Sequence, residues 1–161
     1  LPMSYSAFTT GRPGENRKEF MPFMSNYMDV PNEALYPFGF GLSYSEFEYS
    51  PVSLSGDTLT ADGKITATVT VSNKGKMDGK EPVQLYIRDV KGSVIRPCRE
   101  LKGLQKLLIK AGESVTVSFE ITADMLRFYN EDMEYTAEPG EFTVWIGGSS
   151  LTKNEAQFFI R

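Results

Sequence analysis

The side chains able to do chemistry in this sequence are carboxylates, hydroxyls, amines and one thiol, because the chain of 161 residues contains no histidine. Without histidine, neither a Ser-His-Asp nor a Cys-His nucleophile system can form within the chain. Histidine-based metal sites are excluded for the same reason, and the single cysteine, Cys98, cannot make a zinc site or an internal disulfide. We therefore expect no metal and no other cofactor.

The 21 acidic residues raise the question of a catalytic carboxylate pair. One close group consists of Glu131, Asp132 and Glu134. A catalytic carboxyl needs a pocket that perturbs its pKa, and the sequence around this group gives no sign of one. We interpret the group as a solvated loop and expect no catalytic residue in this chain.

Trp145 is the one large aromatic side chain that could bind a sugar. In an alternating strand it points away from Phe142, Val144 and Ile146. An outward indole can stack on a sugar, because aromatic faces pack well on the apolar faces of sugar rings. It can equally pack against a loop or a neighbouring domain, which is the alternative we favour.

Apolar and polar residues alternate after residue 42, which predicts β-strands that each bury one face. The apolar members of the alternating runs are Ile65, Ala67, Val69 and Val71; Val83, Leu85 and Ile87; Val115, Val117, Phe119 and Ile121; Phe142, Val144 and Ile146; and Phe158 and Ile160. Glycine-containing turn signals separate these runs. One helical turn is expected at residues 123–128, entered through Thr122 or Asp124 as the N-cap.

This pattern predicts an all-β fold, an immunoglobulin- or fibronectin type III-like antiparallel β-sandwich of about seven strands. The sandwich is expected to span residues 42–161. The chain lacks the Cys–Trp–Cys framework of antibody domains, which favours the fibronectin-like variant. The basic residues between 96 and 106 are expected to lie on a solvated edge strand, where lysines discourage pairing with other chains. The alternative is that this basic run binds an acidic partner.

Residues 1–41 differ from the rest of the chain. They hold five of the nine prolines and show no sustained period. Their many aromatic and methionine side chains argue against a disordered tail, since such tails are poor in aromatics. We expect an irregular N-terminal extension that lies against a surface.

At the end of this extension, Phe38, Phe40 and Tyr44 stand close together, with Gly39 and Gly41 between them. Glycine allows close approach of the backbone, so the aromatic rings can turn toward a neighbouring surface. These three residues are predicted to dock the sandwich onto a preceding domain. The alternative is that Phe38 and Phe40 belong to the edge of the sandwich's own core.

Residues 35–44 read LYPFGFGLSY, just before the predicted sandwich. Further distinctive segments are LPMS at 1–4, TGRP at 10–13, PVQLYIRD at 82–89, RELKG at 99–103, PGEF at 139–142 and VWIGGSS at 144–150. Taken in chain order, these segments resemble the C-terminal fibronectin type III-like domain of glycoside hydrolase family 3, and most of all bacterial periplasmic β-glucosidases.

The resemblance implies that residues 1–41 are the last strand of an α/β domain followed by an inter-domain linker. It implies a parent enzyme that is a retaining β-glucosidase, which uses two carboxyl groups roughly 5 Å apart. In this family both carboxyls lie in preceding domains, so no residue here inherits either role. The resemblance also implies a periplasmic or secreted location, and it leaves Arg12 as a possible contact at the active-site rim.

The expected partners are thus the preceding catalytic domains, with carbohydrate substrate reached only through the parent enzyme. A net charge of −4 argues against nucleic acid, and no apolar run approaches the roughly 18 residues of a membrane span. A structural module that braces the catalytic domains is the favoured function. An independent carbohydrate-binding module or a cell-surface interaction module remains the alternative, because the fold alone cannot separate these functions.

Overall fold

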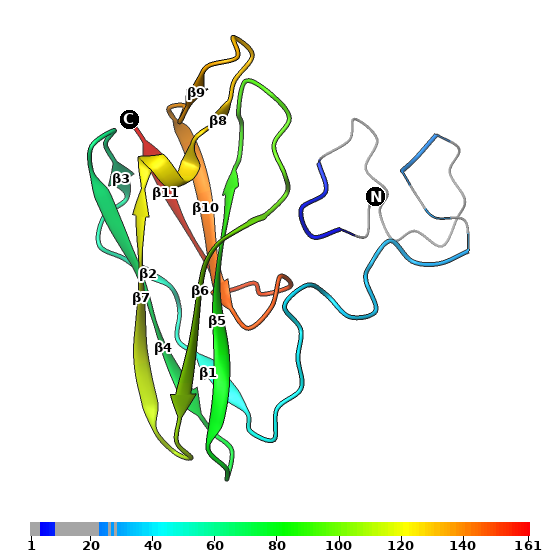
Figure 1. Ribbon diagram of the computed structural model, residues 1–161, viewed down its shortest axis with the longest axis vertical. Helices are drawn as coiled ribbons and strands as arrows, with labels where there is room; N and C mark the ends of the chain where they lie inside the picture. Colours follow the sequence, from blue (N-terminus) through cyan, green and yellow to red (C-terminus); the bar gives the residue numbers. More distant parts are fainter. Residues whose placement is uncertain (1–3, 9–22, 26, 28) are drawn as a thin grey trace.

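The computed structural model describes residues 4–8, 23–25, 27 and 29–161, and most of them form a sandwich of two β-sheets (Figure 1). The four-stranded sheet contains β1 (Phe47–Tyr49), β2 (Ser53–Leu54), β4 (Lys64–Asn73) and β7 (Ser114–Thr122). The five-stranded sheet contains, in spatial order, β3 (Thr58–Leu59), β11 (Glu155–Ile160), β10 (Gly140–Gly147), β5 (Gly79–Asp89) and β6 (Glu100–Ile109).

The strand pairing confirms the predicted fibronectin-like sandwich. β1 and β2 run along the same side of β4, so they act as one interrupted edge strand, and β7 pairs with the other side. All pairings are antiparallel except the short parallel contact between β3 and β11. With β1 and β2 taken together, seven principal strands build the two sheets, and β3 is a short addition at one edge.

The core lies between the sheets and consists of the apolar residues that the alternation selects. In the four-stranded sheet Val69 pairs with Val117 and Ile65 with Ile121, and all four side chains are buried. Phe142 of β10 and Phe158 of β11 stack in the facing sheet, with ring centroids 5.4 Å apart. The intervening polar residues point to solvent, as shown by the hydrogen bond between the Thr68 and Ser118 hydroxyls, 3.0 Å long.

The turn after β4 is held by one buried amide. Asn73 Nδ2 donates to the carbonyls of Met77 at 2.8 Å and Ile109 at 2.9 Å, while its Oδ1 accepts from the Gly75 N–H at 2.9 Å. These bonds satisfy the whole side chain and fix the turn against the end of β6. Asparagine in the turn signal therefore does more than favour a bend, since it also joins the two sheets.

The predicted helical turn is present but shorter than expected. It is a single 3-10 turn, η1 (Ala123–Leu126), that follows β7 directly. Thr122 occupies the N-cap position without a side-chain hydrogen bond, and Asp124 instead pairs with Arg127 at 2.8 Å. Burial of Ala123 and Leu126 holds the turn in place. The hairpin of β8 (Phe128–Tyr129) and β9 (Tyr135–Thr136) comes next.

The chain before β1 is irregular, as predicted, since residues 29–46 form no strand and no helix. In Figure 1 this segment descends beside the five-stranded sheet before it enters β1. No helix in the described part of the chain is long and apolar enough to cross a membrane.

Residues 90–99 connect β5 to β6, and a carboxylate with incomplete hydrogen bonding is buried where this loop begins. Asp89, at the end of β5, is buried; its Oδ1 accepts from the Lys91 N–H at 3.1 Å, whereas Oδ2 has no partner among the described residues. Burial raises the pKa of Asp89, and the Lys91 hydrogen bond and the Arg96 charge offset this only in part. The ionised carboxylate is therefore less stable here than in water.

The alternation predicts opposite effects for two adjacent substitutions in β4. Val69→Asp places an unpaired charge in the core, which costs several kcal/mol out of a typical domain stability of about 5–15 kcal/mol. Thr68→Asp points to solvent beside the Ser118 hydroxyl and should be nearly neutral. Thermal unfolding followed by circular dichroism measures both, and equal losses would contradict the assigned register.

Asp89→Asn should stabilise the chain at neutral pH. The raised pKa means that ionisation costs more in the folded than in the unfolded chain, so stability falls as pH rises above the ordinary aspartate pKa of about 3.9. Asparagine removes that cost while its Oδ1 can still accept from Lys91. The gain in melting temperature should be present at pH 7 and vanish near pH 3. A gain that is as large at pH 3 as at pH 7 would rule out this origin.

Candidate functional site

Two features outside the core are candidates for a functional site: the contact of the N-terminal extension with the five-stranded sheet, and a cleft at one end of the sandwich. Both depend on β5 and β10, whose central residues are buried on both faces of the sheet. The outer face carries Gln84, Tyr86 and Trp145, and residues far away in the sequence cover it.

Gln84 ties three segments together on this outer face. Its Nε2 donates to the carbonyl of Gly39 in the extension at 3.1 Å and to that of Gly148, in the loop after β10, at 2.7 Å. Its Oε1 accepts from the Tyr86 hydroxyl at 2.5 Å. Burial raises the pKa of Tyr86 to about 12, so the phenol stays protonated and remains a donor. The extension is thus attached to the sheet by hydrogen bonds at a defined place.

Gly39 is needed for this attachment. Its φ is +79°, a left-handed conformation that favours glycine, and a Cβ there would overlap the Gln84 amide. The neighbouring Phe38 carbonyl accepts from the Ser150 N–H at 2.9 Å. Gly39 therefore lets the backbone approach the sheet at this point, whereas Gly41 makes no close contact in the described part of the chain.

The predicted docking residues differ in how much of each ring this chain covers. Phe38 stacks on Tyr5 with ring centroids 4.2 Å apart, and Tyr5 in turn meets Tyr86 edge-on. The ring centroids of Phe40 and Tyr36 lie 5.7 Å apart, and Phe40 is 47% exposed. Tyr44 is 94% exposed. None of the three belongs to the core between the sheets.

Trp145 lies on the outer face, as its position in the strand predicts, but its ring is covered. The Arg99 guanidinium carbon lies 4.1 Å from the ring centroid, and the indole N–H donates to Glu155 at 2.6 Å. Only 8% of the residue is exposed. In this structure the ring packs beneath Arg99, and it offers no open face on which a sugar could stack.

The remaining candidates from the sequence lie either in the turn between β8 and β9 or outside the described residues. Glu131, Asp132 and Glu134 are exposed in the turn between β8 and β9, where the Asp132 and Glu134 N–H groups donate to Asn130 Oδ1. Arg12 lies outside the described residues. Among the described residues, no group of three or more cysteine, aspartate or glutamate side chains is placed to hold a metal ion.

The basic residues between 96 and 106 are only in part a solvated edge. β6 is the predicted edge strand of its sheet, and Lys106 is exposed. Arg96 is instead packed over the Phe128 ring at 4.1 Å and bonded to Glu100 at 2.9 Å, and Arg99 covers Trp145. The prediction of a fully solvated run is wrong for these two arginines, because each guanidinium lies on an aromatic ring.

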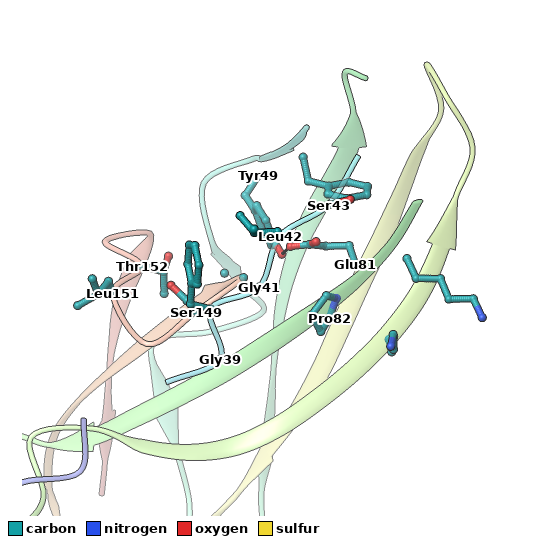
Figure 2. Close-up of a pocket in the computed structure, with 16 residues that line it drawn as sticks. Gly39, Gly41, Leu42, Ser43, Tyr49, Glu81, Pro82, Ser149, Leu151 and Thr152 are labelled. Atoms are coloured by element: carbon teal, nitrogen blue, oxygen red, sulfur yellow. Dashed lines mark hydrogen bonds between the residues drawn. The ribbon is translucent and has the colours of Figure 1, made fainter. Parts of the chain in front are cut away.

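The cleft has a volume of about 580 Å³ and lies where the extension, β1, the start of β5 and the loop after β10 meet. We call it the Glu81 cleft. Its lining residues include Phe40, Gly41, Leu42, Ser43, Tyr49, Lys80, Glu81, Lys106, Gly148, Ser149, Leu151 and Thr152. Figure 2 shows the Glu81 side chain extending toward Tyr49 beside Leu42, with Ser149 and Thr152 beyond Gly41.

The Tyr49 hydroxyl donates to Glu81 Oε1 at 2.7 Å. Burial raises the pKa of Glu81, and the hydrogen bond from Tyr49 offsets this in part. Gly148 allows this arrangement, because a Cβ at that position would lie 2.7 Å from Glu81 Oε1. Glu81 is not among the residues predicted from the sequence, although a signal exists: Glu81 shares its phase with the inward-facing Val83, Leu85 and Ile87, so an acid points inward at the end of the strand.

Comparisons with known proteins agree with this geometry. Residues 81–150 match the model of the fibronectin type III-like domain. The chain is 46% identical over 158 residues to a periplasmic beta-glucosidase of Salmonella typhimurium, covering 98% of this chain and 20% of that protein. It is 48% identical over 139 residues to a putative beta-xylosidase of Formosa agariphila, covering 86% of this chain and 18% of that protein.

A crystal structure of a beta-glucosidase from Listeria innocua superimposes with a TM-score of 0.90 at 39% identity, covering 99% of this chain and 22% of that chain. The chain thus spans about a fifth of the length of the relatives it matches. The sandwich topology, the family model and these relatives lead to one assignment. The chain has a fibronectin type III-like fold and matches the C-terminal domain of glycoside hydrolase family 3 enzymes of the β-glucosidase type.

Proposed function

We propose that this chain is a non-catalytic module that braces the catalytic domains of a β-glucosidase-like hydrolase, acting on β-glucosides in the periplasm or outside the cell. The relatives support this activity and location through their names, since they include a periplasmic beta-glucosidase. Within the proposal, residues 1–41 are the end of an α/β domain and a linker, and residues 42–161 are the sandwich.

The observation that carries the proposal is the exposed apolar surface at the end of the linker. Leu35, Tyr36, Leu42 and Tyr44 are each more than two-thirds exposed, and Phe38 and Phe40 are half-exposed. Together they form a contiguous sequence segment that the sandwich leaves uncovered, although hydrogen bonds to Gln84 and Ser150 anchor its backbone. An anchored backbone with outward aromatic side chains suits a docking surface for a neighbouring domain.

Arg12 at the active-site rim remains part of this proposal, because the resemblance supports a linker that lies beside the catalytic domains. Trp145 has no role in it, since its ring packs beneath Arg99.

The 161-residue chain alone should not hydrolyse aryl β-glucosides. Retaining hydrolysis needs two carboxyl groups on either side of the scissile bond, and in the proposal both lie in preceding domains. Release of p-nitrophenol from p-nitrophenyl β-glucoside measures this. Turnover that copurifies with the chain through several chromatographic steps would contradict a purely structural role.

Docking is tested with Phe40→Ala/Tyr44→Ala, made both in the parent polypeptide and in the 161-residue chain. Burial of one such aromatic side chain is worth roughly 1.5–3 kcal/mol, so the parent should inactivate at a lower temperature and release the module to protease. Hydrolysis at low temperature should persist. In the 161-residue chain these rings have no docking partner, so the change should alter stability by at most about 0.5 kcal/mol.

Tyr135→Ala is a matched control, because Tyr135 is an exposed aromatic in the hairpin at the opposite end of the sandwich (Figure 1). It should leave thermal inactivation of the parent unchanged. Equal destabilisation of the parent and the 161-residue chain by Phe40→Ala/Tyr44→Ala would place these rings in the module's own fold and end the docking proposal.

A further inference from the structure

The Glu81 cleft contains polar groups that the fold itself does not use. Glu81 Oε1 accepts from Tyr49, but Oε2 has no hydrogen-bond partner in the described part of the chain and stays open to solvent. Lys80 and Lys106 line the cleft, and neither forms an ion pair with a described residue. The Ser149 hydroxyl likewise makes no hydrogen bond among the described residues. Lys80 and Lys106 lie on the opposite face of the sheet from Glu81, because Lys80 and Pro82 alternate with Glu81 and Lys106 pairs with Pro82. Glu81 Oε2 and the Ser149 hydroxyl are therefore the acceptor and the donor in the cleft that the described fold leaves unused.

The shape of the cleft suits a small ligand. A volume of about 580 Å³ lies within the range of roughly 300–1,000 Å³ that is typical of small-molecule sites. Apolar side chains form part of its walls: Phe40, Leu42 and Leu151 are 47%, 93% and 65% exposed. The floor is positioned firmly, because the Gln84 amide holds both the linker at Gly39 and the loop at Gly148.

The mixture of groups selects among ligand classes. A free anion such as phosphate would be repelled by the Glu81 carboxylate, and a lipid chain would leave the carboxylate without a partner. A sugar matches the remaining groups: its hydroxyls can donate to Glu81 Oε2 and accept from the Ser149 hydroxyl, while a C–H face can pack on the Phe40 ring. We propose that the Glu81 cleft binds a neutral mono- or disaccharide.

This site binds without cleaving. Glu81 is the only carboxylate among the described residues that line the cleft, and glycoside hydrolysis needs two. The proposed role is therefore an accessory saccharide site on the module, beyond its role as a brace. The docking variant Phe40→Ala/Tyr44→Ala removes the Phe40 ring from the cleft but leaves the polar groups of Glu81 and Ser149 in place.

The test is a titration of the ¹⁵N-labelled 161-residue chain with cellobiose, followed by amide chemical shifts. Saturable shifts are expected at residues 39–43, at Glu81 and at residues 147–152, with a dissociation constant on the order of 1 mM. Glu81→Gln should weaken binding about tenfold, because it removes a charge-assisted hydrogen bond but keeps an acceptor for Tyr49. Glu131→Gln, an exposed acid in the distant hairpin, is the matched control and should bind as the unchanged chain does.

Ser149→Ala provides an independent variant, because its hydroxyl makes no described hydrogen bond and its loss should leave the fold intact. It should weaken cellobiose binding about threefold. The proposal is overturned if cellobiose produces no saturable shifts, or if neither Glu81→Gln nor Ser149→Ala weakens them. It is also overturned if inorganic phosphate shifts the same residues more strongly than cellobiose does.

Discussion

Burial of β5 and β10 on both faces is the constraint on which the rest of this structure depends. The inner faces build the core, but within the described residues no second sheet covers the outer face of the five-stranded sheet. The linker and the loop after β10 cover it instead, and the Gln84 amide donates to both of them. An unsatisfied buried amide costs about 1–3 kcal/mol, so Gln84 favours one position of the linker. That position directs Phe40 and Tyr44 outward and forms one wall of the Glu81 cleft.

Arginine side chains cover parts of the outer face of the five-stranded sheet that the linker and the loop after β10 leave open. Arg99 lies over Trp145 and donates to the carbonyls of Ser150 and Thr152, the latter at 2.9 Å. Burial lowers the pKa of Arg99, while the charge of Glu155 acts in the opposite direction. Glu155 also accepts from the indole, so the cation, ring and carboxylate stabilise one another. A cation placed over an aromatic face gains most when both are partly desolvated, which explains why these basic residues are not simply solvated.

The sequence predicts features that depend on the local alternation of apolar and polar residues. It does not predict burial that depends on contacts with residues far away in the chain. Val69 and Thr68 were assigned to opposite faces correctly, because alternation alone sets the side of a strand. Trp145 was assigned to the outer face correctly, but its burial comes from Arg99, 46 positions earlier in the chain, and no local pattern shows that contact. Glu81 was missed although it keeps the inward phase of Val83, because the alternating apolar run hides an acid at its end. Its partner Tyr49 is 32 positions away, so only the folded chain pairs them.

The linker and the cleft are physically coupled, because the same short segment contributes to both. Residues 39–43 form a wall of the cleft, while Phe40 and Tyr44 are the proposed docking side chains. Phe40 is proposed for both interactions, so a docked domain that covers its ring competes with a sugar that packs on it, whereas Tyr44 takes part in docking alone. By linkage, whatever free energy docking contributes to saccharide binding, saccharide binding contributes equally to docking. The glycines at 39 and 148 allow this coupling, because a side chain at either would push the linker or the loop away from β5.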